Sequence, residues 1–237
     1  IKKFLNRKIT KYTNLYVKLF KENIIIQILN NFYTDVRYFP EKGIDPAIYR
    51  YSRITENYDI FRSDDYVVAK LKNKYIKLAN IKTISESEYD GTTSYQTLFE
   101  GLFMNFMIET NIDCNLKIVK NGHVSTKERL NMDSTQFEKY FDVECDNNVK
   151  GMQILTHDAM EQFVKLYDKT KAKFEISIRN NNVFIKLNTG DMYEPKEIIR
   201  DIISKHYLKH YYDMIEVINI LAINVIKIIE QKKEEIS

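Results

Sequence analysis

One stretch in the middle of the chain, residues 93–107, is apolar on both of its faces if it is extended. Alternate side chains of a strand point to opposite faces. One face then carries Leu98, Leu102, Met104 and Phe106, and the other carries Phe99 and Phe103. Such a strand must be covered on both sides, so the sequence predicts that this stretch lies in the centre of a covered sheet.

The rest of the expected sheet comes from shorter stretches that alternate apolar and polar residues. Lys72-Asn73 predicts a hairpin turn between two of them, and Asn180-Asn181 predicts a second hairpin between two others. The strands expected besides the central one are residues 66–72, 74–83, 112–118, 174–178 and 183–187.

Apolar residues at helical spacing predict a long N-terminal helix over residues 1–33. Its apolar face is Leu5, Ile9, Tyr12, Tyr16 and Leu19. Three further helices are expected to begin at the N-caps Asp45, Ser134 and Thr156, because such side chains accept hydrogen bonds from the first turn. Pro195 begins a last helical region that extends almost to the C-terminus.

These elements predict an α+β fold, a mostly antiparallel sheet of about six strands flanked by long N- and C-terminal helices. The 237 residues can bury a sizeable core, and the 44% hydrophobic content excludes a disordered chain. Without an internal repeat or linker, one soluble domain is expected. It would comprise a basic amphipathic helix (1–33), a sheet-rich core (34–190) and C-terminal helices (191–237).

Charge is distributed unevenly along the chain. The formal net charge is only +3, yet residues 1–21 contain seven basic residues and no acidic one. The remainder of the chain is therefore net negative. The basic residues form a candidate membrane-proximal face: Lys2, Lys3, Arg7, Lys8, Lys11, Lys18 and Lys21.

This basic helix allows three interpretations. It could expose a solvated face opposite a packed apolar stripe. It could bind anionic lipid, where each Lys or Arg contributes about 1 kcal/mol. It could also bind nucleic acid, with Tyr12 and Tyr16 stacking on bases.

The C-terminal helix has a narrow polar stripe and a wide apolar surface. The stripe comprises Asp213, Glu216, Asn219, Asn224, Lys227 and Gln231. The apolar surface is expected to pack against the sheet and the first helix, and a homo-oligomer through this helix is the alternative.

His206, His210 and Asp213 are the candidate metal ligands, because their spacing places all three on one helical face. No HExxH motif supplies a general base, and the neighbouring tyrosines favour ordinary surface or core histidines instead. His157, Asp158 and Glu161 are interpreted as charges at the start of a helix, and the acidic run 85–90 as a solvated turn.

Cys114 and Cys145 lack a CxxC partner and are expected to be buried structural thiols in a reducing compartment. No phosphate-binding glycine loop, nucleophile elbow or paired-carboxylate motif is present. We therefore predict no catalytic residue and no cofactor, and a non-enzymatic role.

Several segments resemble a known family in order and spacing. Residues 136–143 resemble its EFEKYFxV segment, and residues 154–161 resemble ILTPxLMExL, with His157 where Pro is usual. Residues 97–103 resemble its FxGLF strand, and Gly43-Ile44 and Tyr58-Asp59 fit its earlier part. This is the bacterial family of domain of unknown function 3137, and the resemblance covers roughly residues 35–215.

The resemblance implies a pair of N-terminal transmembrane helices ahead of this domain, which agrees with a chain that starts at Ile1. It further implies a cell-membrane location with the domain on the cytoplasmic side, and a membrane-protein partner of the LemA family. It implies no catalytic residue.

The leading hypothesis is a membrane-tethered module that interacts with a protein or lipid surface. The alternatives are a metal-dependent enzyme using His206, His210 and Asp213, and nucleic-acid binding through the basic helix.

Overall fold

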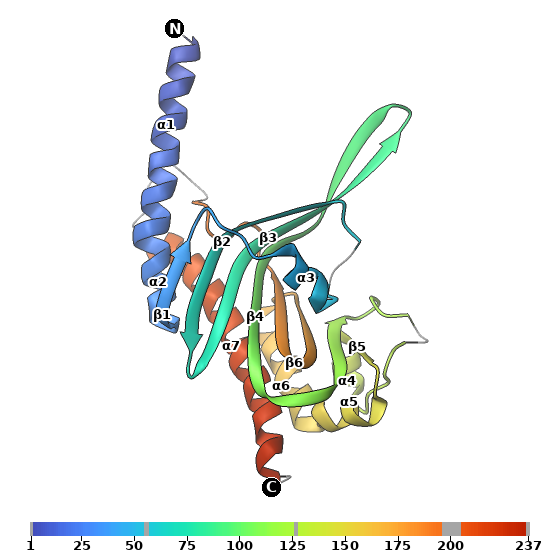
Figure 1. Ribbon diagram of the computed structural model, residues 1–237. Coiled ribbons are helices and arrows are strands. Elements are labelled where there is room, and N and C mark those ends of the chain that lie inside the picture. Colours follow the sequence, from blue (N-terminus) through green and yellow to red (C-terminus); the bar gives the residue numbers. More distant parts are fainter. Residues whose placement is uncertain (1, 55–56, 126–127, 196–204, 236–237) are drawn as a thin grey trace.

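The computed structural model describes residues 2–54, 57–125, 128–195 and 205–235 (Figure 1). Its centre is a six-stranded antiparallel sheet in which β1 to β5 are neighbours in sequence order and β6 pairs with β4. The strands are β1 (Thr34–Phe39), β2 (Ile60–Leu71), β3 (Lys74–Tyr89), β4 (Thr92–Lys120), β5 (Phe141–Cys145) and β6 (Phe174–Asn188). The predicted α+β fold with an antiparallel sheet is confirmed.

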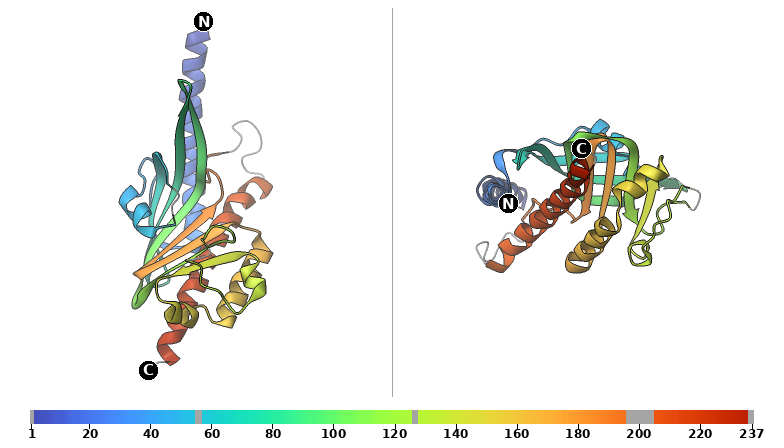
Figure 2. Two further views of the ribbon diagram at one scale, coloured as in Figure 1. Left: turned by 90° about the vertical axis from the view of Figure 1, so that its right-hand side faces the viewer. Right: turned by 90° about the horizontal axis from the view of Figure 1, so that it is seen from below.

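Over residues 101–106 strand β4 is buried on both faces, as the sequence predicts, whereas residues 93–97 at its start are exposed. Leu102, Met104 and Phe106 belong to the main core. Phe99 and Phe103 belong to a second, smaller core on the opposite face. Figure 2 shows α6 and α7 on one side of the sheet and α3 on the other. The alternation of apolar side chains thus corresponds to two cores.

The long strands differ from the sequence prediction. Residues 93–107 and 112–118 are parts of the single strand β4, and the predicted hairpin at Asn180-Asn181 is wrong, because β6 runs through it without reversing. Both halves of β6 pair with β4, and the register shifts where they meet. Asn180 has φ 56°, so it is a local irregularity in an extended chain.

The hairpin at Lys72 is confirmed, and so are the three predicted N-caps. Asp45, Ser134 and Thr156 accept hydrogen bonds from the backbone N–H groups of residues 47, 137 and 159. The helices are α1 (Lys2–Phe20), the π-helical turn η1 (Lys21–Ile25), α2 (Ile26–Phe32), α3 (Pro46–Ser52), α4 (Thr135–Glu138), α5 (Asn148–Ile154), α6 (His157–Thr170) and α7 (Lys205–Glu235).

Helix α7 packs against α2, α6, β4 and β6, which buries most of its apolar surface within the chain. Ile218, Leu221 and Ala222 are fully buried. The expected packing on the sheet and the N-terminal helical region is therefore observed. None of the helices in the described part of the chain is both long and apolar enough to span a membrane.

Two elements project from the body on the same side (Figure 1). One is α1, and the other is the end of the β3–β4 hairpin, which includes the acidic run 85–90. That run belongs mainly to β3, and the chain reverses at Asp90-Gly91, both of which have positive φ. The acidic side chains beyond Ser85 are exposed, as expected.

Candidate functional site

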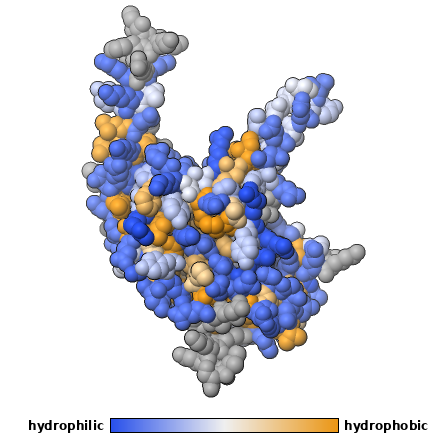
Figure 3. All heavy atoms as spheres, in the orientation of Figure 1, coloured by the Kyte–Doolittle hydropathy of each residue, from blue (hydrophilic) through white to orange (hydrophobic). Residues whose placement is uncertain are grey.

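Helix α1 exposes apolar and basic side chains together. Ile9, Tyr12, Leu15 and Leu19 each expose between 50 and 65% of their surface. Figure 3 shows hydrophobic side chains along this projecting helix, surrounded by hydrophilic ones. The interpretation of a packed apolar stripe is therefore wrong for these residues, because α1 extends beyond the sheet. The side chain of Leu5 lies outside the described residues.

The basic residues of the candidate face differ in their surroundings. Lys8, Lys11 and Lys18 are exposed, and Lys18 pairs with Glu22 across one turn at 3.7 Å. Lys2, Lys3 and Arg7 belong to α1, but their side chains lie outside the described residues. Lys21 does not belong to an exposed face, because it is only 6% exposed. It follows the projecting part of the helix and points into the body.

Lys21 lies at the centre of a buried charge cluster. Its Nζ is 2.9 Å from Asp65 Oδ2 and 2.5 Å from Glu194 Oε1. The hydroxyl of Tyr38 donates a hydrogen bond to the other oxygen of Asp65. The cluster joins η1 to β1, to β2 and to the segment that follows β6, so it attaches the base of the N-terminal helix to the sheet.

A β-bulge positions Asp65. Asp64 pairs with Asn80, and the next pair is Val67 with Leu78. Two residues of β2 therefore lie opposite one residue of β3. Asp65 has φ 54°, and its backbone N–H donates to the carbonyl of Pro40 at 3.1 Å. The bulge turns Asp65 toward Lys21, while Asp64 stays half-buried beside the cluster.

Burial and ion pairing together determine the pKa values in this cluster. Desolvation raises the pKa of Asp65 to about 7, although its bonds to Tyr38 and Lys21 act in the opposite direction. Burial also raises the pKa values of Asp64 and Asp191. For Lys21, burial is outweighed by the bonds to Glu194 and Asp65, so its pKa is raised and the ammonium is charged.

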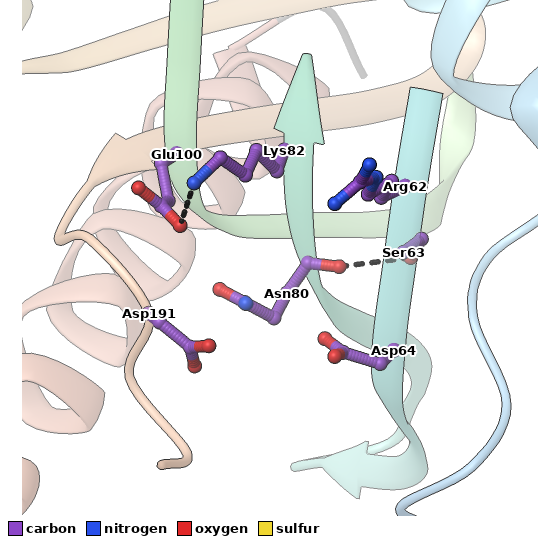
Figure 4. A pocket seen from close by; sticks show the side chains of 7 residues that line it. All are labelled: Arg62, Ser63, Asp64, Asn80, Lys82, Glu100 and Asp191. Carbon is purple, nitrogen blue, oxygen red and sulfur yellow. Dashed lines mark hydrogen bonds and ion pairs between the residues drawn. The ribbon is translucent and has the colours of Figure 1, made fainter. Parts of the chain in front are cut away.

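Two hollows meet beside the bulge and share Asp64, and the smaller of them is polar. The smaller, of about 270 Å³, is lined by Arg62, Ser63, Asp64, Asn80, Lys82, Glu100 and Asp191. Figure 4 shows the carboxylates of Asp64 and Asp191 on either side of Asn80, with Lys82 paired to Glu100 at 2.9 Å. The larger, of about 680 Å³, lies along the base of α1. Neither lining contains a His or Cys, and the hydroxyl of Ser63 in the smaller hollow donates to the backbone carbonyl of Asn80 at 2.8 Å.

The expected metal set on α7 stays a prediction. The side chain of His206 lies outside the described residues. Asp213 accepts a hydrogen bond from Lys209 at 2.5 Å, and the His210 ring contacts Tyr211. At the start of α6, His157 and Asp158 are exposed, and Glu161 pairs with Lys165 at 2.7 Å. These three residues lie at a solvated helix start.

The two cysteines lie next to each other, which their spacing in the sequence does not indicate. Cys114 of β4 is buried, whereas Cys145 at the end of β5 is half-buried. A hydrogen bond from the Cys114 thiol lowers the pKa of Cys145 to about 7.

The burial of Lys21 is likewise absent from the sequence predictions. Its helical spacing to Ile25 and Ile28, both buried, is the signal that places it on the inner face.

Replacing Asp65 with Asn should reduce the dependence of stability on pH. The pKa of Asp65 is about 7 in the folded chain, above the roughly 3.9 of an unfolded aspartate. The folded state therefore binds more protons between about pH 4 and 7, and the free energy of unfolding falls as the pH rises through this range. Denaturant unfolding at about pH 5 and pH 8 measures the difference.

In D65N this decrease should be smaller, although Asp64 and Asp191 still contribute to it. The exposed Asp133 provides the control, since D133N should keep the wild-type difference. An unchanged difference in D65N would contradict the prediction.

Comparison with known proteins gives a family and one fold similarity. A family model described as a protein of unknown function, DUF3137, matches residues 97–227. The chain is also similar to a solved structure, the crystal structure of the mycobacterial trehalose monomycolate transport factor A. The TM-score is 0.45 and the identity 8%, over 84% of this chain and 96% of that one. No curated protein matches the sequence.

Proposed function

This chain belongs to the DUF3137 family of proteins of unknown function, and we propose that it is a non-enzymatic interaction module that binds an anionic lipid surface through α1. The observation that carries the proposal is that α1 leaves an apolar face and lysines exposed on one projecting helix. Contiguous apolar surface of this kind marks an interaction site.

The geometry of α1 supports a lipid surface. At 100° per residue, Ile9, Tyr12, Leu15 and Leu19 fall within roughly 120° of arc. Lys8, Lys11 and Lys18 lie within and beside one edge of this arc, and α1 contains no acidic residue. An amphipathic helix of this kind inserts its apolar face at the headgroup boundary while its cations contact anionic lipid.

The same side chains favour lipid over nucleic acid. Stacking needs exposed aromatic rings, yet Tyr16 is only partly exposed and Tyr12 is the more accessible of the pair. Among the side chains of α1 that the structure describes, the other exposed large apolar residues, Ile9, Leu15 and Leu19, are aliphatic, and aliphatic groups partition into acyl chains. We place the domain at the cytoplasmic side of a membrane in this proposal, because basic residues next to a membrane favour that side.

Charge reversal at Lys8, Lys11 and Lys18 tests the proposal. Each lysine near an anionic surface contributes about 1 kcal/mol, so the triple Glu variant should bind anionic vesicles roughly 100-fold more weakly. Co-sedimentation with vesicles of phosphatidylcholine alone, and of phosphatidylcholine with phosphatidylglycerol, measures the change.

Exposed lysines elsewhere provide the matched control. The control reverses the charge of three exposed lysines on the body, Lys77, Lys120 and Lys139. It changes the net charge by the same amount but not on α1, so it should alter vesicle binding much less. An I9S/L15S/L19S variant keeps every charge and should also bind more weakly, because it lacks the apolar face. Equal binding by all variants would overturn the proposal. Binding of a purified LemA-family protein without any binding to vesicles would instead favour a protein surface.

A further inference from the structure

We propose that Cys114, Cys145 and Asp146 form a binding site for a thiophilic divalent metal ion of the zinc class. The two sulfur atoms and a carboxylate oxygen of Asp146 all lie within 4.8 Å of one another. Thiolate and carboxylate are ligands that zinc takes in proteins. This site lies on β4 and at the end of β5. It is distant in sequence from His206, His210 and Asp213 of α7, the candidate ligands that helical spacing predicted.

Strand pairing brings the ligands together from distant parts of the sequence. Cys145 pairs with Leu116, two residues beyond Cys114, so both cysteines point to the same face of the sheet. Asp146 follows directly, and its backbone N–H donates to the carbonyl of Asn115 at 3.3 Å. The end of the β5 ladder thus places the carboxylate beside the thiols.

The diagonal relation of the cysteines favours a metal ion over a disulfide. A disulfide needs Cβ atoms about 3.8 Å apart, whereas diagonal neighbours on paired strands are generally farther apart. A tetrahedral zinc ion with Zn–S distances of about 2.3 Å holds its two sulfur atoms about 3.8 Å apart. The two sulfur atoms lie within 4.8 Å of each other, so a change of about 1 Å in their separation is enough to reach that distance.

Neighbouring residues orient the ligands, and the Cys145 thiol donates to the carbonyl of Asn147 at 3.1 Å. Asn115 donates to Asp146 from its backbone N–H at 2.8 Å and from Nδ2 at 2.6 Å, which fixes the carboxylate as outer hydrogen bonds do in metal sites. Gly151 leaves room beside Cys145, since a Cβ there would lie 3.0 Å from its sulfur. The nearby cation Lys150 is held by Asp113 at 2.6 Å.

The site would keep one position for solvent. Cys114 is 5% exposed, Cys145 is half-buried and Asp146 is exposed, so the ligands lead from the core to the surface. With three protein ligands such an ion would keep one position at which a small molecule can bind, whereas structural zinc sites use four protein ligands.

Cobalt substitution tests the inference on the reduced chain under anaerobic conditions. One equivalent of Co²⁺ should give a sulfur-to-cobalt charge-transfer band and tetrahedral d–d bands, and added Zn²⁺ should abolish both. C114S and C145S should each lose the charge-transfer band, and N115A should weaken cobalt binding by about tenfold. Circular dichroism of each variant establishes that it folds.

A matched control separates this site from the α7 candidates. The H210A/D213N variant should bind cobalt like the wild type. A cobalt signal that survives both cysteine substitutions, or disappears in H210A/D213N, would overturn the inference. The inference would also be overturned if the reduced wild-type chain bound no cobalt. This holds whether or not Cys114 and Cys145 form a disulfide in air. Vesicle binding through α1 is measured in a separate experiment. Failure of the metal inference therefore leaves the proposed lipid binding untouched, and the reverse also holds.

Discussion

Replacing Lys21 with Met should lower the free energy of unfolding by about 3–5 kcal/mol, because it removes the cation from a buried ion pair and leaves the Asp65 carboxylate without a counter-charge. The side chain of Asp65 is 0% exposed and that of Lys21 is 8% exposed, so water cannot substitute for the missing partner. Chemical denaturation followed by circular dichroism at about pH 8 measures the loss.

Lys18 provides the control for this substitution, one turn earlier on the same helix. Its ion pair with Glu22 is exposed, so K18M should change the free energy of unfolding by less than about 0.5 kcal/mol. The decrease in the free energy of unfolding caused by K21M should be smaller at about pH 5, because Asp65 can bind a proton there. The double variant K21M/D65N should recover part of the loss, because no unpaired carboxylate remains at residue 65. Equal effects of K18M and K21M would contradict this account of the cluster.

Replacing Gly101 with Ala should lower the free energy of unfolding by about 3 kcal/mol or more, because β4 has neighbours on both edges there. Gly101 pairs with Ile81 of β3 and with Asn188 of β6. An added Cβ would lie 2.2 Å from the carbonyl oxygen of Leu187 and 2.8 Å from the backbone nitrogen of Thr189. Both contacts are with backbone, so the strands must separate.

A glycine at a free turn gives the contrasting case. Gly91 has φ +69°, and a Cβ added there would meet no atom within 4 Å, so G91N should cost less than about 1 kcal/mol. Asparagine tolerates this backbone conformation. Thermal and denaturant unfolding of both variants measures the difference, and a G101A variant as stable as G91N would show that β6 can move away from β4 at little cost.

Local patterns predicted much of the fold correctly. The two-sided apolar pattern around Phe103 identified the central strand, because burial on both faces leaves no position for polar side chains. The caps at Asp45, Ser134 and Thr156 were also correct, since a cap depends only on residues within the same turn. Edge strand β1 was missed, because it is short and none of its residues is fully buried.

Other features depend on partners that are distant in sequence. Asn180-Asn181 between two alternating runs is compatible with a hairpin or a bulge, and only pairing of both runs with β4 selects the bulge. Lys21 resembles its exposed neighbours until Asp65, 44 residues later, is placed beside it. The same holds for Cys114 and Cys145, which have no local spacing that indicates a shared site.

The amino-acid order alone specifies the fold class, the central strand, the helix caps and the concentration of positive charge at one end, because each depends on neighbours within a few residues. Tertiary packing selects which of those charges are accessible. Seven basic residues precede residue 22, yet Lys21 is buried in an ion pair while Lys8, Lys11 and Lys18 remain exposed. The physical reason is that α1 extends beyond the sheet, so Ile9, Tyr12, Leu15 and Leu19 remain at least half exposed (Figure 1). Where the helical region meets the sheet, Asp65 on its bulge lies within ion-pair distance of Lys21.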